Sequence, residues 1–481
     1  MLVASFVTNR PTIHELNLFI MKLEIANEEK PHDTPNPPNP SRVSVSMKSL
    51  SIQPHKYFCF ISKFKMFWIK LCIILAYFCI IIGIEFTYRN ILFNKSLSAI
   101  TNLQHKLPSS AKMFFKILSH LGTAKCTLTT FAVVFIFFPI SSSYLYISVI
   151  IYASYTTNTM KLIYQNPRPI FIDINNTLEN GLSCNNGFGN PSGHSLTAVA
   201  VYLSLWHIVT NFNYFTHNKK GIALRIVLLI VFICVIVLIV LSRIILGAHS
   251  INQVIYGSTI GLGIYGIFFY IFQYHLYDSE FLYRDFALHF LKKITIIAYS
   301  CVHCCMLLLC LLLYFLHKPN ESKLEQYTNV LINKQCKKRD MYLQFQYDAL
   351  FQCLSVFGIV GANCGIYLLF YLVKKKYKSD IGGLVVHWNW GNRSVKHFFI
   401  RLAFAVVSAV GIVLYFAVPG NSDLWIVMVF KSSIAFFTGL FGLYGVGIYL
   451  SIINKAGNLF IYTKVNANDN SVSRCCFFGQ R

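Results

Sequence analysis

Three cationic side chains and two histidines stand at the borders of long apolar runs. They are Lys161, Arg168, His194, Arg243 and His249. A charged group next to lipid is costly to maintain, so residues of this kind in a membrane protein indicate a functional site. Fixed cations are suited to the negative charge that spreads over a phosphoryl group during its transfer. The sequence therefore points to phosphate chemistry.

Each residue type has a possible role in the hydrolysis of a phosphate ester. The two arginines offer planar, bidentate donors, and the lysine adds a third positive charge. Backbone N–H groups of Ser192 and Gly193 can add donors, because Pro191-Ser192 resembles the start of a helix, whose N-terminus favours anions. Of the two histidines, one can attack phosphorus and form a phosphohistidine while the other protonates the departing oxygen.

This chemistry requires no metal and no cofactor. The polar connection 161–193 contains only two carboxylates, Asp173 and Glu179, and so offers no cluster for a metal ion. Each of the five residues also has a structural interpretation when taken alone. Lys161 or Arg243 could anchor a helix end at the membrane interface, and a histidine could cap a helix. The complete set, in this order and spacing, favours a functional site.

Composition sets the class of protein that must position these residues. The chain has 481 residues, of which 55% are hydrophobic and only 12% are charged, about half the charged fraction of soluble proteins. Many apolar runs are close to 20 residues long, which predicts an all-α, polytopic integral membrane protein. The net charge of +24 is spread over tails and connections. It therefore indicates contact with membrane lipid, and not with nucleic acid.

The apolar runs predict a six-helix core followed by about four further transmembrane helices. We expect a disordered cytosolic tail over 1–61, the core over 62–275, the C-terminal extension over 276–454 and a cytosolic tail over 455–481. The expected core spans are 66–88, 123–140, 142–160, 195–211, 223–242 and 251–273, and 89–121 is expected to contain an interfacial amphipathic helix. The expected spans of the extension are 295–316, 349–373, 399–418 and 425–450.

The helix count predicts which side of the membrane carries the site. Lys56, Lys63 and Lys65 precede the first span and favour a cytosolic N-terminus. Counting spans from there places both motif-bearing connections, 161–193 and 243–249, on the non-cytosolic face. The five residues can therefore share one pocket.

Three sequence motifs resemble the signatures of a known superfamily. Lys161-X6-Arg168-Pro, Pro-Ser-Gly-His194 and Ser-Arg243-X5-His249 are similar to those of the type 2 phosphatidic acid phosphatase (PAP2) and vanadium haloperoxidase superfamily. The resemblance covers about 66–273. It implies a metal-independent phosphoric monoester hydrolase in which both arginines and the lysine bind phosphate, His249 is the nucleophile and His194 is the general acid.

One position departs from the members that act on lipids, which have an aspartate four residues after the nucleophilic histidine. Here that residue is Gln253, preceded by Asn252, and both are expected to orient the nucleophile. The glutamine, the Cys184 segment before the second motif and the additional C-terminal spans resemble the glucose-6-phosphatase branch. The N-terminal tail and first span resemble the lipid phosphatases instead.

These resemblances leave three functions open. A sugar phosphate such as glucose 6-phosphate is the favoured substrate, with the endoplasmic reticulum favoured over the plasma membrane. A lipid phosphate such as phosphatidic acid is the alternative, and a non-catalytic protein that binds or transports phosphate is the second alternative. Cys184 and Cys336 are both expected in non-cytosolic connections, where they would form a disulfide or remain free thiols.

Overall fold

The computed structural model describes residues 54–138, 140–173, 178, 187–210, 218–272, 293–333, 349–377, 395–418 and 423–453. Every regular element in these ranges is a helix, and the prediction of an all-α membrane protein is confirmed. The chain divides into two units, Met1–Phe60 and Ile61–Arg481. The site and the packing described below belong to the second unit.

The N-terminal part of this unit contains the helices that carry the motifs and their neighbours, and the first of them, α2, starts before Ile61. They are α2 (Pro54–Lys106), α3 (Ser109–Ser119), the 3₁₀ turn η1 (His120–Gly122), α4 (Ala124–Phe137), α5 (Ile140–Tyr164), α6 (Pro169–Ile172), α7 (Gly193–Thr210), α9 (Lys219–Ile245), α10 (Ile251–Gly266) and the π-helical turn η2 (Ile267–Phe272). The C-terminal part contains α13 (Lys293–Leu316), α14 (Glu321–Asn333), α16 (Val356–Tyr377), α17 (Val395–Ala417) and α18 (Leu424–Ile453).

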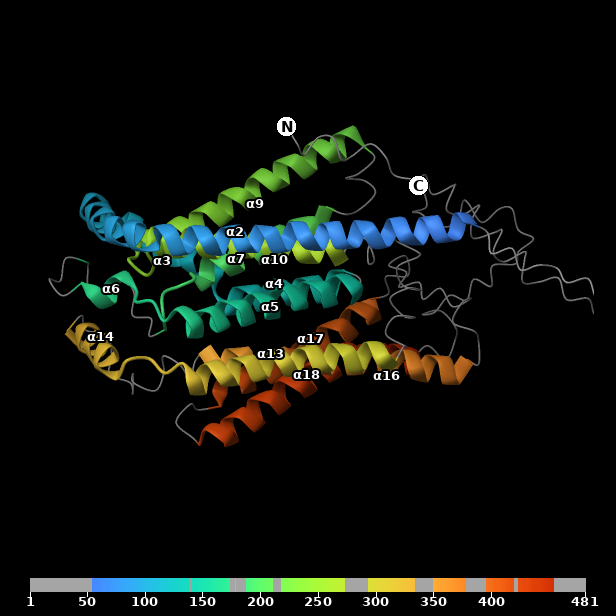
Figure 1. Cartoon of the computed structure of the whole chain (residues 1–481). Coiled ribbons are helices and arrows are strands. Elements are labelled where there is room, and N and C mark those ends of the chain that lie inside the picture. The colour runs from blue at the N-terminus through green and yellow to red at the C-terminus, as the bar shows by residue number, and fades with distance from the viewer. Residues whose placement is uncertain are drawn as a thin grey trace, which may run out of the picture. The chain divides into compact units, whose positions relative to one another are not determined.

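Helices α5, α7 and α10 form the centre of the motif-bearing part, and α9 packs on α7 (Figure 1). The core between them includes Tyr146, Val149 and Ala153 of α5 and Leu196 and Ala200 of α7, all of which are buried. The small residues among them, Ala153 and Ala200, let the helix backbones approach closely, as is common between membrane helices.

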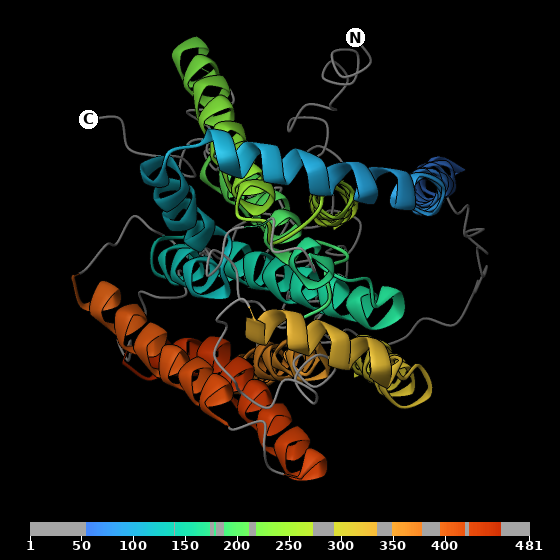
Figure 2. The same ribbon diagram turned by 90° about the vertical axis from the view of Figure 1, so that its left-hand side faces the viewer.

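The C-terminal helices lie against α4 and α5 (Figures 1 and 2). Helices α13 and α16 contact α5, and α17 contacts α4. Arg401 of α17 donates to the carbonyl oxygens of Phe135, at 3.3 Å, and Phe138, at 2.9 Å. These are carbonyls at the end of α4, which its own helix cannot satisfy.

Four helices are long and apolar enough to cross a membrane, among the residues that the structure describes. These candidate spans are Cys72–Lys106, Lys219–Ile245, Ile297–Leu316 and Leu424–Gly442, with a fifth if the bent pair Ser109–Gly122 and Ala124–Phe137 counts as one span. Ten spans were expected. The central helix α10 has only 16 residues and does not reach the length of a span on its own.

Two expected boundaries differ from the structure. Helix α2 begins at Pro54, so the last residues of the expected 1–61 tail belong to a helix, whereas 1–53 lie outside the described residues. The same helix continues to Lys106, and therefore only α3 and η1 correspond to the amphipathic helix expected within 89–121. Helix α3 exposes Met113, Phe114 and Ile117, as expected for a helix that meets lipid.

Candidate functional site

The five motif residues come together from four places in the fold. Lys161 lies in the last turn of α5 and Arg168 just before α6, His194 lies in the first turn of α7, and Arg243 and His249 border the turn between α9 and α10. All five line one cavity of about 480 Å³. The sequence-based prediction that they share a pocket therefore agrees with where the structure places them.

A tight turn brings Arg243 and His249 together. Gly247 adopts a φ of 66°, in the left-handed region that ends many helices and that glycine tolerates best. The N–H groups of Ala248 and His249 then both donate to the carbonyl oxygen of Arg243, at 3.1 and 3.2 Å. The turn thereby reverses the chain within the length of the third motif.

The hydrogen bonds of His249 define its tautomer. Its Nδ1 lies 2.8 Å from the carbonyl oxygen of Gly189, which can only accept, so Nδ1 carries the proton. Its Nε2 lies 3.0 Å from Nη1 of Arg168, which can only donate. The lone pair is therefore on Nε2, and this nitrogen is the nucleophilic atom of the ring.

Arg168 is fixed from several sides. Its Nε donates to the carbonyl oxygen of Gly187 at 2.5 Å, and its Nη1 donates to that of Ala248 at 3.1 Å. Arg168 as a whole is 4% exposed. Burial and the neighbouring Arg243 lower the pKa of Arg168 to about 9. A bound anion would relieve this accumulation of positive charge.

Arg243 has hydrogen-bonding capacity that no described residue uses. It is 3% exposed, and its Nη1 donates to Oγ of Ser119. Its Nε and Nη2 are buried and have no hydrogen-bond partner among the described residues. Since buried guanidinium groups are normally paired, these two donors indicate the position of an anionic ligand.

Two glycines lie beside the ammonium group of Lys161. A Cβ atom on Gly187 or on Gly193 would lie 3.9 Å from its Nζ. His194 lies beside Gly122 of η1. A Cβ atom on Gly122 would lie only 3.1 Å from Cδ2 of His194. Gly122 was not identified from the sequence, because it lies far from the motifs along the chain.

Gln253 contacts all three motif segments. Its Oε1 lies 3.3 Å from Nδ1 of His249, and its Nε2 donates to the carbonyl oxygen of Pro167 at 2.7 Å. Its backbone carbonyl accepts from the N–H of Ser192 at 3.0 Å. Gly189 makes room for the side chain, since a Cβ there would lie 2.5 Å from Nε2 of Gln253.

Two expected roles need correction. The Ser192 N–H donates to Gln253, and its Oγ lies 2.9 Å from Oγ of Ser195, so Ser192 braces the motif and does not offer its N–H to phosphate. Asn252 does not bond to the imidazole of His249. Its Nδ2 lies 3.3 Å from Oε1 of Glu85, and its Oδ1 accepts from Oγ of Ser250 at 2.7 Å. It orients the turn that carries His249.

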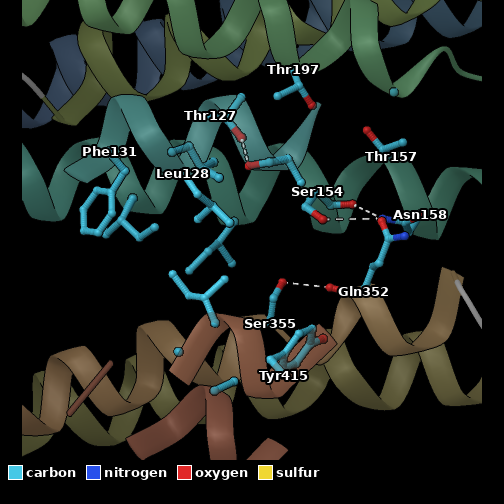
Figure 3. Close-up of a pocket in the computed structure, with 18 of the residues that line it drawn as sticks. Thr127, Leu128, Phe131, Ser154, Thr157, Asn158, Thr197, Gln352, Ser355 and Tyr415 are labelled. Carbon is cyan, nitrogen blue, oxygen red and sulfur yellow. Dashed lines mark hydrogen bonds between the residues drawn. The ribbon is translucent and has the colours of Figure 1, made fainter. Parts of the chain in front are cut away.

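The cavity continues beyond the five motif residues. Figure 3 shows side chains that line this continuation. Ser154, Thr157 and Asn158 of α5 line it, and Gln352 and Ser355 face them from the chain that leads into α16. These residues were not predicted from the sequence. The spacing of the residues on α5 could have revealed them, because positions 154, 157, 158 and 161 fall on one helix face and are all polar.

The predicted disulfide between Cys184 and Cys336 lies outside the described residues.

Tyr164 and Ile170 do not line the cavity. An opening toward lipid near these two residues would have favoured a lipid substrate. Tyr164 Oη instead lies 2.8 Å from Oη of Tyr256, and Ile170 is 2% exposed.

The fold and the site together define a helical membrane protein with a buried, cationic pocket that contains two histidines. Residues 143–277 match the family model of the PAP2 superfamily. The matched region includes all three motifs and ends before α13. Comparisons with curated proteins and with solved structures give no match. The match agrees with the superfamily-level prediction over this region but does not reach the glucose-6-phosphatase branch, and it supports a phosphatase, in general terms a phosphoric monoester hydrolase.

Proposed function

We propose that this protein is a membrane phosphatase that hydrolyses phosphate monoesters through a phosphohistidine at His249. The observation that carries the proposal is the unprotonated Nε2 of His249, which lies in the same cavity as the two donor atoms of Arg243 that no described residue pairs with. A nucleophilic nitrogen beside donors for an anion is the arrangement that phosphoryl transfer needs.

In the first step, Nε2 of His249 attacks phosphorus and the bond from phosphorus to the alcohol oxygen breaks. Lys161, Arg168 and Arg243 stabilise the charge that spreads over the three remaining phosphoryl oxygens. Burial, followed by Arg243 and Arg168, lowers the pKa of His194 well below its ordinary value, and the negative charge of the bound ester offsets these cations so that His194 can hold a proton. His194 donates this proton to the departing oxygen, so that the alcohol leaves neutral. Gly189 O and Gln253 hold the ring of His249 through Nδ1 while Nε2 carries the phosphoryl group.

In the second step, water attacks the phosphohistidine. His194, now neutral, accepts a proton from this water, and the bond between phosphorus and Nε2 breaks. The products are inorganic phosphate and the original form of both histidines. No further group enters the atom balance.

The substrate could be a sugar phosphate or a lipid phosphate. Gln253 and the resemblance to glucose-6-phosphatase support the sugar. The cavity supports the lipid, because it extends past the cations between apolar side chains such as Phe131 and Ile147. A sugar would leave that apolar section empty, so the geometry favours a phosphate ester with an apolar part.

We also propose that the site faces the non-cytosolic side of the endoplasmic reticulum membrane. The proposal rests on the predicted helix count and on the charge distribution around the first span. Modification of a cysteine placed beside the site by an impermeant thiol reagent, in sealed vesicles of known orientation, would test it. Protection from the reagent in vesicles with their luminal face inside is the expected result.

The mechanism can be tested on purified protein with a panel of sugar, lipid and chromogenic phosphate monoesters. His249→Ala should abolish both turnover and acid-labile labelling of the protein by ³²P-labelled substrate. His194→Ala should lower turnover by about 10²–10⁴-fold. With p-nitrophenyl phosphate, whose leaving group needs no proton, this variant should still accumulate the labelled intermediate.

Turnover that survives in both variants would exclude the phosphohistidine. If the wild-type protein binds phosphate but hydrolyses no monoester, a non-catalytic binding or transport protein is the better explanation.

A further inference from the structure

The cavity is much longer than a phosphate group requires. Its lining follows α5 from Lys161 back to Tyr144, a stretch of about 25 Å at the helical rise of about 1.5 Å per residue. Beyond the cations, its opposite wall comes from the C-terminal helices, including Ile359, Ile412 and Phe416. These helices lie after the region that matches the superfamily.

A polar section follows directly after the cations. Asn158 Nδ2 donates to Oε1 of Gln352 at 2.9 Å and to the carbonyl oxygen of Ser154 at 2.8 Å. Ser355 Oγ donates to the carbonyl oxygen of Gln352 at 2.7 Å (Figure 3). The Gln352 side chain is exposed and lines the cavity, so its amide can meet a ligand. We call Ser154, Asn158, Gln352 and Ser355 the polar collar.

An apolar section lies beyond the polar collar. Its lining side chains are Leu128, Phe131, Phe135, Ile147, Ile151, Ile359, Ile412 and Phe416. Three hydroxyl groups in this section donate to protein acceptors: Ser148 to the carbonyl oxygen of Tyr144 at 2.7 Å, Thr438 to that of Ile434 at 2.7 Å, and Tyr144 to Oδ1 of Asn363 at 2.6 Å. This end of the cavity therefore offers a ligand mainly hydrocarbon contacts.

We infer that the C-terminal helices form the leaving-group half of the active site and select a single-chain amphiphilic phosphate ester. The polar collar binds hydroxyl or amide groups next to the phosphate, and the apolar section holds one hydrocarbon chain. The volume of about 480 Å³ suits one ligand in the range of about 300–1,000 Å³ typical of small-molecule pockets. The inference rests on the proposed phosphatase activity and adds the source of its specificity.

Blocking the apolar section tests the chain site. Ile147→Trp places a bulky ring about 21 Å along α5 from Lys161, at about 1.5 Å per residue. The assay uses p-nitrophenyl phosphate and a series of hydroxyalkyl phosphates of increasing chain length. The variant should lose at least about tenfold in kcat/KM for the longest chains and keep the rate for p-nitrophenyl phosphate.

Ile230→Trp is the matched control, because Ile230 lies on α9, is 56% exposed and does not line the cavity. It should change neither rate. Unchanged turnover of long chains in Ile147→Trp, or a wild-type rate independent of chain length, would overturn the inference while leaving the phosphatase proposal intact. A wild-type protein inactive even on p-nitrophenyl phosphate would overturn both.

Changing the polar collar tests its share of recognition. Gln352→Leu should lower kcat/KM about tenfold for long-chain phosphates with a hydroxyl beside the phosphate, the worth of about one hydrogen bond. It should not lower the rate for plain alkyl phosphates of equal length. Gln326→Leu, at an exposed position of α14, is the control and should leave the ratio of the two rates unchanged. An unchanged ratio in Gln352→Leu would contradict the assignment.

Discussion

The imidazole of His249 is held by neutral groups in a strongly positive environment. Burial, together with Arg168 and Arg243, lowers the pKa of His249 well below its ordinary value. The ring therefore stays neutral, and Nε2 stays nucleophilic, at pH values where an exposed histidine would be half protonated. Gly189 O and Gln253 fix the ring without adding the negative charge that an aspartate would bring.

Gln253→Glu should move the acidic limb of the kcat/KM profile to higher pH. A carboxylate beside the imidazole favours the protonated ring and raises the pKa of His249, so the neutral nucleophile is lost at a higher pH than in the wild type. The profile should be measured with two esters of different second pKa, because the substrate also ionises near pH 6. Two results would contradict this account of His249: an acidic limb at the same pH in both proteins, or one whose position changes with the second pKa of the ester.

The same substitution should also remove a hydrogen bond that holds the segment before Arg168 in place. A glutamate has no N–H to donate to the carbonyl oxygen of Pro167, which holds the segment before Arg168. Gln253 thus orients the ring of His249 and also holds the segment that contains Pro167. Only the first of these roles could be predicted from its position four residues after His249.

At the scale of elements, short turns position the chemical groups more than the long helices do. The reversal at Gly247 places His249 beside the end of α9. The short helix α6 and the segment around Phe188 are covered by α14, where Phe171 stacks on Tyr327 with ring centroids 5.4 Å apart. A C-terminal helix therefore stabilises the connection that carries the first two motifs.

Gly247→Ala should destabilise the protein by about 1–2 kcal/mol and reduce activity, because a Cβ is strained in the left-handed conformation. Gly83→Ala is the matched control: Gly83 lies within α2, where a Cβ would meet nothing within 4 Å. The control should keep its activity and be at least as stable as the wild type. Thermal unfolding and turnover of p-nitrophenyl phosphate measure both effects, and equal behaviour of the two variants would refute the role of the turn.

At the scale of the whole molecule, buried positive charge makes stability depend on an anion. Lys161, Arg168 and Arg243 surround the same cavity, and a ligand that neutralises them binds only the folded state. Binding of inorganic phosphate should therefore stabilise the entire fold.

The thermal midpoint should rise with phosphate concentration, by the equivalent of about 2.7 kcal/mol at one hundred times the dissociation constant. Arg243→Gln should remove most of this rise. Arg225→Gln, on the same helix but stacked on Trp206 at 5.1 Å, should retain it. A full phosphate-dependent rise in Arg243→Gln would show that the donors of Arg243 do not face the anion.

The sequence was sufficient to predict the all-α membrane fold and the five residues that share the pocket. Their types and spacing are local properties, and the parity of the expected spans predicts both connections on one side of the membrane. The partner of Nδ1 in His249 could not be named, because Gly189 contributes a backbone carbonyl, which no side-chain pattern reveals. The length of α2 was also missed, since its charged and polar residues interrupt the apolar run that was used to define the span.

The C-terminal wall of the cavity was beyond prediction for another reason. Asn158 and Gln352 meet across a long stretch of chain, and nothing in the local pattern around either residue indicates the other. Such contacts depend on how α13 and α16 pack against α5, and hydrophobic periodicity does not determine that packing.

The division of the cavity between two parts of the chain has an evolutionary consequence. The five motif residues lie before residue 273, whereas much of the remaining wall of the cavity comes from residue 349 onward. Substitutions in the second part can accumulate without touching the histidines. A lineage could therefore acquire new substrates through substitutions in the C-terminal helices while the motif residues stay the same. The motifs of a related protein would then indicate its reaction but not its substrate.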